Sequence, residues 1–290
     1  MAREIEHWVK QETKIKCIAL DMDRTTLNRD GKLSEGNRKA LEQAIAAGIH
    51  VIIASGRAFD TLPEDVLAVP GIEYAITSNG AAMYHVPDGK CLKRHQLGAD
   101  AVEAIMKATK SESVTYEAFI NGIAYADKAY VEEPARFDAP PEAVAYVKAT
   151  RHILDDIKKF IEENKHHLDS MDVIVKDKEA NEKVWEQIKN ATDEVYITSS
   201  FAQLVEIADK NAGKKSGVAF FMELLGLKRE EIAAFGDADN DADMLRFAGC
   251  GVAMENASEG CREAADYITK HHDEDGLAYG IRYILKQNEG

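Results

Sequence analysis

The sequence has few cysteines, a deficit of positive charge and no long apolar run, and each shortage excludes a class of protein. Its four cysteines are widely separated and include no Cys-x-x-Cys pair, which argues against a disulfide framework and against a zinc site. No apolar stretch approaches the roughly 18 residues needed to cross a bilayer. The first residues contain no apolar segment of signal-peptide length. We therefore expect a cytoplasmic protein that does not enter a membrane.

Positive charge is scarce: 36 Lys and Arg face 51 Asp and Glu, for a formal net charge of −15. Nucleic acids and anionic membrane surfaces attract basic patches, so neither is an expected partner. A small anionic substrate would need local cations to offset this charge. The histidine pairs His166-His167 and His271-His272 lie in polar surroundings, and we expect both to be solvated.

The first part of the chain alternates apolar runs with a helical pattern. Short apolar runs cover residues 15–20, 49–54 and 74–77, and a helix is predicted from Ser34 to Ala47. Strand, helix and strand in this order are typical of a parallel sheet. Residues 1–13 are a polar extension, for which we consider a helical conformation.

The pattern changes near residue 85. Asn121-Gly122 is a strong hairpin signal, and residues 132–146, which contain three prolines, are expected to form an irregular loop. Charged helices are predicted over 155–165 and 178–189, and strands over 171–175, 195–198 and 204–207. Hairpins mixed with helices indicate an α+β unit with a partly antiparallel sheet.

From residue 209 the first pattern returns. A helix is predicted over 217–225, followed by strands over 232–235, 251–254 and 267–269. At 290 residues the chain is long enough for two units. We predict an α/β core with a parallel sheet, made of residues 1–84 and 209–290, and an inserted α+β domain over 85–208.

Polar residues follow four of the predicted core strands. In open α/β sheets ligands bind beyond the carboxyl ends of the strands, so these residues are expected to meet. They are Asp21 and Asp23 after the first strand, Ser55 and Gly56 after the second, Asn79-Gly80 after the third, and Asp237, Asn240 and Asp241 after a later one, with Lys214 before a helix. Phosphoryl transfer needs a nucleophile, a charge-neutralising metal, donors and an acid. A set of oxygen ligands favours Mg²⁺.

Simpler interpretations exist for each motif alone. An isolated Asp-x-Asp is most often a solvated turn, and Asn79-Gly80 is either a turn or a phosphate-side element. The acidic run from Asp237 to Asp241 superficially suggests a calcium loop. Its sixth position is Ala242 rather than Gly and its twelfth is Ala248 rather than Glu, which excludes that interpretation.

Taken together, the motifs resemble the haloacid dehalogenase superfamily, and within it the Cof-type phosphatases (type IIB, with the larger C2 cap). The matching segments, in family order, are Asp21-Met22-Asp23-Arg24-Thr25, Ser55-Gly56-Arg57, Asn79-Gly80, Lys214 before a helix ending in Leu-Gly-Leu, and Gly236-Asp237-Ala238-Asp239-Asn240-Asp241. The resemblance covers residues 14–282. It implies a Rossmann-like core and an inserted cap that governs substrate specificity.

The resemblance also implies roles for individual residues. Asp21 is the expected nucleophile, and Asp23 the acid and base, with its backbone carbonyl on the metal. The expected Mg²⁺ ligands are Asp21, Asp23, Asp237 and Asp241, and the expected phosphate-binding residues are Ser55, Gly56, Lys214 and Asn240. Two positions depart from the pattern: Arg24 and Lys215 each stand where this branch usually has Gly. The adjacent lysines leave open a shift by one residue, although the distance to Leu-Gly-Leu favours Lys214.

The resemblance implies a Mg²⁺-dependent phosphatase that hydrolyses small phosphate monoesters, such as sugar or cofactor phosphates, through an aspartyl-phosphate. Two alternatives remain open: a phosphosugar mutase of the same superfamily, and a non-catalytic scaffold that binds a phosphate ligand. We expect a monomer or homodimer. No motif within residues 85–208 names the substrate, but Tyr116, Phe119 and Tyr125 flank the predicted hairpin and are candidates to face the site.

Overall fold

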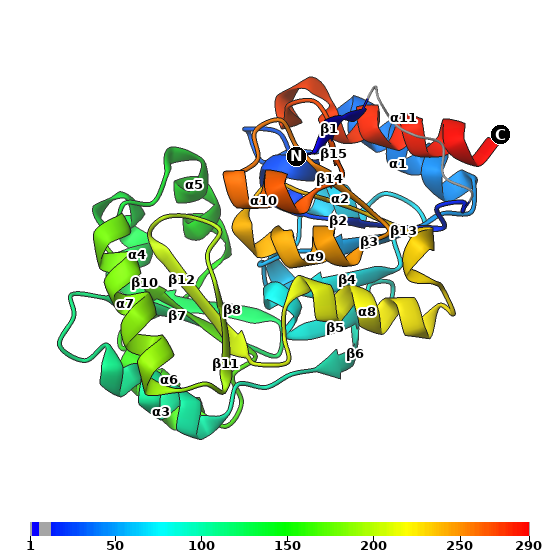
Figure 1. The fold of residues 1–290 in the computed structure, drawn as a ribbon. Helices are drawn as coiled ribbons and strands as arrows, with labels where there is room; N and C mark the ends of the chain where they lie inside the picture. The colour runs from blue at the N-terminus through cyan, green and yellow to red at the C-terminus, as the bar shows by residue number, and fades with distance from the viewer. Residues whose placement is uncertain (1, 6–12, 290) are drawn as a thin grey trace.

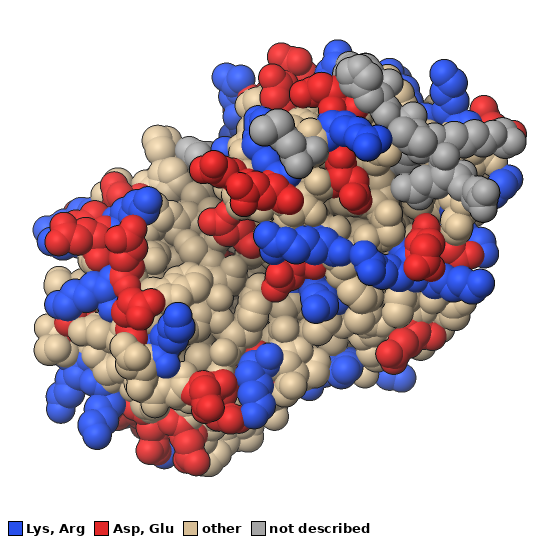
Figure 2. Space-filling view, in the orientation of Figure 1, with Lys and Arg blue, Asp and Glu red and all other residues tan. Residues whose placement is uncertain are grey.

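The computed structural model describes residues 2–5 and 13–289 of the chain, arranged as two lobes (Figure 1). One lobe is built on a nine-stranded sheet and the other on a six-stranded sheet; we call them the core lobe and the cap lobe. Acidic and basic side chains are interspersed over both lobes on the face shown in Figure 2. Within the described residues, no helix is long and apolar enough to cross a membrane.

The core sheet is parallel except for its last hairpin. In sheet order its strands are β1 (Arg3–Glu4), β15 (Tyr267–Ile268), β14 (Cys250–Ala253), β13 (Ile232–Gly236), β2 (Cys17–Leu20), β3 (His50–Ala54), β4 (Tyr74–Thr77), β5 (Ala82–His85) and β6 (Lys90–Arg94). The β4–β5 and β5–β6 pairs are antiparallel. The predicted α/β class with a parallel sheet is therefore confirmed.

Helices cover both faces of the core sheet, which explains why its central strands are continuous apolar runs. Along β2, Ile18 and Leu20 pack into one hydrophobic cluster and Cys17 and Ala19 into another. The first cluster includes residues of α1 (Glu35–Ala46), α2 (Glu64–Leu67) and α11 (Gly276–Glu289), and the second residues of α8 (Lys214–Leu224), α9 (Ala242–Phe247) and α10 (Glu259–Ala264). A strand buried on both faces needs apolar residues at every position.

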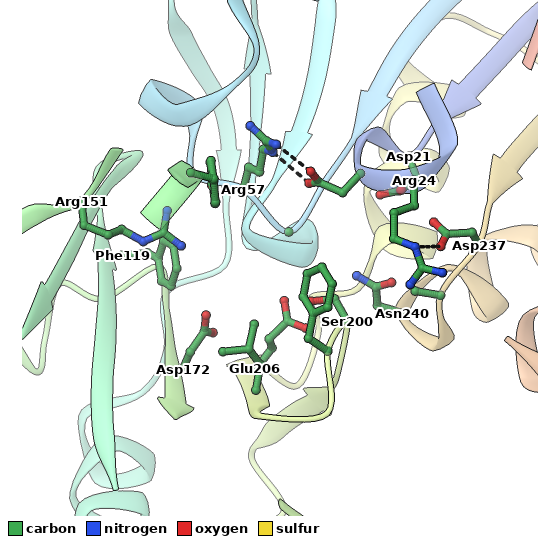
Figure 3. Close-up of a pocket in the computed structure, with 16 residues that line it drawn as sticks. Asp21, Arg24, Arg57, Phe119, Arg151, Asp172, Ser200, Glu206, Asp237 and Asn240 are labelled. Atoms are coloured by element: carbon green, nitrogen blue, oxygen red, sulfur yellow. Dashed lines mark hydrogen bonds and ion pairs between the residues drawn. The ribbon is translucent and has the colours of Figure 1, made fainter. Parts of the chain in front are cut away.

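The cap sheet is mostly antiparallel, with three helices on one face and two short helices, at residues 128–132 and 141–150, packed at the edge of the other. Its strands, in sheet order, are β11 (Val195–Thr198), β12 (Leu204–Asp209), β10 (Ser170–Ile174), β7 (Thr115–Ile120), β8 (Ile123–Asp127) and β9 (His152–Leu154). Helices α3 (Ala99–Ala108), α6 (Ile157–Asn164) and α7 (Lys178–Ala191) contribute to the hydrophobic cluster on the first face. The other face, which carries Phe119, Asp172 and Glu206, is turned toward the core lobe (Figure 3).

The structure corrects the expected loop over 132–146. The segment contains the end of α4 (Lys128–Glu132), a short 3-10 turn at Pro134–Phe137 and the start of α5 (Pro141–Thr150). Pro140 and Pro141 stand at the beginning of α5, where proline is tolerated because the first N–H groups of a helix have no partner. Two of the prolines that suggested a loop therefore mark the start of helix α5.

Two boundaries also differ from expectation. Strand β6 pairs with β5 in the core sheet, so that sheet continues beyond residue 85, where we placed the start of the insertion. At the N-terminus, Arg3–Glu4 forms the edge strand β1 on β15 rather than a helix. Residues 6–12 of the predicted extension lie outside the described part of the chain. The division into two domains remains a proposal.

Candidate active site

The carboxyl ends of β2, β3, β4 and β13 meet beneath the cap lobe, as expected for a parallel sheet. A cavity of about 80 Å³ lies between the two lobes at this place. From the core lobe it is lined by Asp21, Asp23, Arg24, Gly56, Arg57, Asp237, Ala238 and Asn240, and from the cap lobe by Phe119, Tyr146, Arg151, Asp172, Ser200, Phe201, Leu204 and Glu206 (Figure 3). The site therefore combines strand-end residues of one sheet with face residues of the other.

Asp21, Asp237 and Asp241 form a buried acidic group around Lys214. The lysine Nζ lies 2.6 Å from Oδ1 of Asp21 and 2.6 Å from Oδ1 of Asp241. Burial and the charge of Asp241 raise the pKa of Asp21, and the same two effects raise the pKa of Asp237 to about 7. Burial alone would lower the pKa of Lys214, but the two carboxylates raise it above its usual value. The lysine is therefore a permanent cation that partly offsets the acidic group.

This acidic group fits a hard divalent cation. One ligand oxygen from each of Asp21, Asp237 and Asp241 lies within 4.8 Å of the others, and all three side chains are buried. Both oxygens of Asp241 are already bound: Oδ1 to Lys214, and Oδ2 by the backbone N–H groups of Asp237 and Ala238 at 3.0 Å. Asp237 also has both oxygens engaged, by Thr25 at 2.9 Å and Asn256 at 3.4 Å, so all three carboxylates are candidate ligands, and Asp241 in addition orients the lysine and the loop. An oxygen-only donor set suits Mg²⁺.

The Asp23 carboxylate lies outside this group and pairs with Arg57. Arg57 Nε and Nη2 donate to the two oxygens of Asp23 at 2.8 and 2.6 Å (Figure 3). Burial alone would raise the pKa of Asp23, but the guanidinium outweighs it and holds the pKa below its usual value. The other side of Arg57 lies 4.1 Å from the ring centre of Tyr146 in the cap lobe. No role was predicted for Arg57, although it stands directly after Ser55-Gly56.

The two departures from the family pattern receive different explanations. Arg24 has φ of +59°, a left-handed conformation that glycine adopts most easily and that costs another residue about 1–2 kcal/mol. Its Nε lies 3.7 Å from Oδ2 of Asp237, and its half-exposed side chain lines the cavity. Lys215 is exposed, whereas Lys214 is buried against Asp21. Of the two lysines, Lys214 is the one at the site.

The remaining expected phosphate-side residues surround the same cavity. Gly56 lines it directly, and a Cβ there would stand 3.0 Å from Oε1 of Glu206. Ser55 is buried beside it, with its Oγ accepting from the backbone N–H of Arg57 at 3.1 Å. Ser55 and Lys214 do not themselves line the cavity. They lie one layer behind its surface.

Asn79 joins the core lobe to the cap lobe. Its Nδ2 donates to Oε1 of Glu206 at 2.9 Å, and its Oδ1 accepts from Nδ2 of Asn240 at 3.0 Å. The residue has φ of +50°, and Gly80 after it approaches the backbone of Gly213 so closely that a Cβ would stand 2.2 Å from the Gly213 carbonyl oxygen. The Asn79-Gly80 turn therefore holds the lobes together and presents no free donor to the cavity.

Of the three aromatic candidates in the cap, only Phe119 lines the cavity. Successive side chains of a strand point to opposite faces, so in β7 Phe119 faces the site while Tyr116 packs among the helices. Tyr125 of β8 packs on Phe160 at a ring-centre distance of 4.7 Å. The expectation that Tyr116 and Tyr125 face the site is wrong, because side chains alternate along each strand and these two lie on the face covered by helices.

The expectation that both histidine pairs are solvated is wrong for His272. His166 and His167 are exposed, but His272 is buried and its Nδ1 lies 3.0 Å from the carbonyl oxygen of Leu27. His271, His272 and Asp273 also bring ligand atoms within 4.8 Å of one another. The hydrogen bond to Leu27 gives His272 a structural role.

Comparison with known proteins identifies the family. A family of haloacid dehalogenase-like hydrolases matches residues 18–281. Phosphatase YwpJ of Bacillus subtilis is 30% identical over 289 residues, which cover 93% of this chain and 100% of that protein. The 5-amino-6-(5-phospho-D-ribitylamino)uracil phosphatase YcsE of the same organism is 28% identical over 274 residues, covering 94% and 97%.

Solved structures agree with the sequence comparison. A haloacid dehalogenase-like hydrolase from B. subtilis has a TM-score of 0.81 at 26% identity, covering 92% of this chain and 99% of that one. A phosphatase of the same superfamily from Bacteroides thetaiotaomicron has a TM-score of 0.78 at 26% identity, covering 96% and 98%. The resemblance inferred from the motifs is confirmed: the chain belongs to the haloacid dehalogenase-like hydrolases and is an enzyme of that family.

Proposed function

We propose that the protein is a Mg²⁺-dependent phosphatase that hydrolyses small phosphate monoesters through an aspartyl-phosphate on Asp21. One observation carries the proposal: Asp21 lines the cavity with Asp237 close by and the ammonium of Lys214 2.6 Å behind it. A carboxylate held beside a fixed cation and a metal-ligand partner is suited to attack phosphorus. Bound Mg²⁺ would neutralise phosphoryl oxygens and the carboxylates around them.

The chain's own residues supply the remaining steps. Asp21 forms a bond from its carboxylate oxygen to phosphorus, the bond to the ester oxygen breaks, and Asp23 gives its proton to the departing alkoxide. Asp23 then takes a proton from water, whose oxygen displaces Asp21 and releases inorganic phosphate. The Arg57 pair favours the ionised form of Asp23, which is the base of the second step. The acid step therefore requires Arg57 to move away from Asp23 when substrate enters.

The shape of the site favours a small ester. The cavity of about 80 Å³ has room for a phosphoryl group and a few further atoms. It adjoins a larger cavity of about 610 Å³, and Asp23, Arg24, Arg57, Tyr146 and Phe201 line both. A substrate longer than the inner cavity would extend into this outer one. That the relatives YwpJ and YcsE are named phosphatases supports the same reaction class.

The proposal is tested by assaying a panel of phosphate esters, including p-nitrophenyl phosphate and glucose 6-phosphate, with and without Mg²⁺. We expect release of inorganic phosphate that EDTA removes and Mg²⁺ restores, and a loss of at least about a thousandfold in kcat for Asp21→Asn. The matched control is Asp239→Asn, since Asp239 is an exposed carboxylate in the same loop as Asp237. An inactive wild type, or full activity in Asp21→Asn, would contradict the mechanism.

The same assay distinguishes the alternatives. A phosphosugar mutase would convert glucose 6-phosphate to an isomeric ester and release little inorganic phosphate. A non-catalytic scaffold would bind phosphate esters, as seen by a thermal shift, without turnover of any of them. A location in the cytoplasm and a monomeric or homodimeric state remain predictions; size-exclusion chromatography with light scattering tests the second.

A further inference from the structure

Three carboxylates stand side by side on the face of the cap sheet that closes the cavity. Glu117 of β7 is the direct cross-strand partner of Asp172 in β10, and Asp172 is the direct partner of Glu206 in β12. All three are more than nine-tenths buried. Like charges directly opposite each other destabilise a sheet. An unusual row of this kind calls for compensating positive charge.

Arg151 forms an ion pair with the first member of the row, and its charge acts on Asp172 only from further away. Its Nε and Nη2 donate to the two carboxylate oxygens of Glu117 at 2.6 and 2.9 Å. The other acidic residues that line the cavity each have a basic neighbour within 4 Å: Lys214 for Asp21, Arg57 for Asp23 and Arg24 for Asp237. Among the described residues, no basic side chain forms an ion pair with Asp172 or Glu206. In the described part of the chain, they are the carboxylates of the cavity wall that feel positive charge only at a distance, from Arg151 and Lys214.

Their hydrogen-bonding capacity is also unfilled. Oε2 of Glu206 is buried without a hydrogen-bond partner, while Oε1 accepts from Asn79. Burial, together with the charges of Glu206 and Glu117, raises the pKa of Asp172 well above its usual value, and burial raises that of Glu206 against the opposing effect of Ser200 and Asn79. Both side chains point into the cavity (Figure 3). Buried acceptors without donors are costly, so a ligand that supplies positive charge and N–H donors would stabilise this wall.

A metal ion does not fit this need. In the described part of the chain, only two groups of acidic or histidine side chains bring ligand atoms within 4.8 Å of one another, and neither contains Asp172 or Glu206. An ammonium group tolerates wider spacing, because its three N–H donors can reach separate acceptors.

We propose that Asp172 and Glu206 bind a primary ammonium group on the alcohol part of the substrate, so that the preferred substrates are amine-bearing phosphate monoesters. This inference rests on the proposed phosphatase function and names its substrate class. Glu206 reaches the phosphate end through Asn79 and Asn240, with hydrogen bonds of 2.9 and 3.0 Å. Glu206 also lies against Gly56, where an added Cβ would stand 3.0 Å from Oε1, so the ammonium group would bind beside the expected phosphate-side loop.

The test compares esters that differ only in an amine or a hydroxyl. Suitable pairs are glucosamine 6-phosphate with glucose 6-phosphate, and 2-aminoethyl phosphate with 2-hydroxyethyl phosphate. We expect kcat/KM to be at least about tenfold higher for the amine in one or both pairs, as charge-assisted hydrogen bonds allow. If the two carboxylates instead share a proton and bind neutral hydroxyls, the hydroxyl esters will be hydrolysed as well as the amines or better, which would overturn the inference.

Variants of the wall identify the residues responsible. Asp172→Asn and Glu206→Gln keep shape and remove charge, so each should reduce the amine-to-hydroxyl ratio of kcat/KM about tenfold. Glu103→Gln is the matched control, since Glu103 is an exposed carboxylate of α3 in the same lobe. An unchanged ratio in both wall variants, with folding verified by circular dichroism, would also overturn the inference. If the wild type hydrolyses p-nitrophenyl phosphate but shows no preference for the amine in either ester pair, this inference alone is contradicted. If the wild type is inactive on every ester, the proposed function is contradicted.

Discussion

The cavity has one wall from the core lobe and one from the cap lobe, and the two walls differ in how the charges of their carboxylates are neutralised. On the core wall, each carboxylate that lines the cavity has a cation close by, and Lys214 alone contacts both Asp21 and Asp241. On the cap wall a row of three carboxylates has one arginine. On the core wall, basic side chains and a metal ion would balance the carboxylates. On the cap wall, we propose that a ligand supplies the positive charge that balances Asp172 and Glu206. The first arrangement suits chemistry that is the same for all esters, and the second suits selection among them.

The difference follows from the geometry of the two sheets. The core sheet is parallel, and its functional residues stand where strands end and the backbone turns. The cap sheet presents the face of a mostly antiparallel sheet, on which alternate residues of each strand share one side, and Phe119, Asp172 and Glu206 reach the cavity from three neighbouring strands. The loop after a strand holds a few side chains in a fixed arrangement. The face of a sheet holds a row of side chains, which can be substituted without altering the fold.

The largest effect is expected from removing the cation of the core wall. Lys214→Met leaves Asp21 and Asp241 buried without a partner, and breaking a buried ion pair in this way lowers the free energy of unfolding by about 3–5 kcal/mol. Activity should fall below detection. Urea denaturation and the phosphatase assay measure both. Lys215→Met, the adjacent and exposed lysine, should behave as wild type; equal losses in the two variants would contradict the assignment of Lys214.

The corresponding change in the cap wall should have a somewhat smaller effect. Arg151→Met leaves Glu117 unpaired beside Asp172, and we expect a loss of about 3 kcal/mol in the free energy of unfolding. Adding Glu117→Gln should restore much of that loss, because the unpaired charge is removed with its partner. Urea denaturation of the wild type, both single variants and the double variant gives the coupling energy. Additive effects would show that the pair is not an energetic unit.

The Arg57 contact links the two walls, and its loss should affect catalysis more than folding. Arg57→Gln frees Asp23 from the paired guanidinium and removes the stack on Tyr146. We expect kcat/KM to fall about 10- to 100-fold, less than the roughly 10²- to 10⁴-fold contribution of a general acid or base, because Asp23 itself is retained. Arg57→Lys keeps the positive charge but cannot donate to both oxygens of Asp23 as the planar guanidinium does, so it should recover only part of the loss. Steady-state kinetics would exclude a positioning role if both variants retained wild-type kcat/KM.

The smallest expected effect is a gain in stability. Asp172→Asn replaces a carboxyl that burial and its acidic neighbours make costly to ionise, and it should raise the free energy of unfolding by about 1 kcal/mol at neutral pH, or a few degrees in Tm. The pKa of Asp172 is raised in the folded state. The unfolded chain therefore loses this proton from about pH 4 upward while the folded chain retains it, so wild-type stability falls as pH rises.

The advantage of Asp172→Asn over wild type should accordingly grow between pH 5 and pH 8. Thermal melts of both proteins across this range measure the difference in Tm. A constant difference would show that Asp172 titrates as an ordinary surface carboxylate. A lower Tm for Asp172→Asn at all pH values would show that the row is stabilised by contacts that the structure does not contain.

The sequence predicts the core wall well because its residues follow local rules. Asp21, Asp237 and Lys214 lie beside strands whose apolar runs are plain in the sequence, and the carboxyl ends of parallel strands necessarily meet. The structure brings these three together, with Asp241, and leaves the Asp23 carboxylate with Arg57. The Arg57 pair was missed because a guanidinium on a flexible side chain has no partner that sequence spacing alone can name.

By itself, then, the sequence determined the family, the α/β core and the carboxylates on which the chemistry depends. The tertiary structure alone decided the cap wall, since Asp172 and Glu206 are adjacent only through the register of β10 against β12. A shift of one residue in that register would leave the two side chains on opposite faces of the sheet. Strand ends are marked locally by composition, but the pairing of strands far apart in the chain depends on the packing of the whole cap.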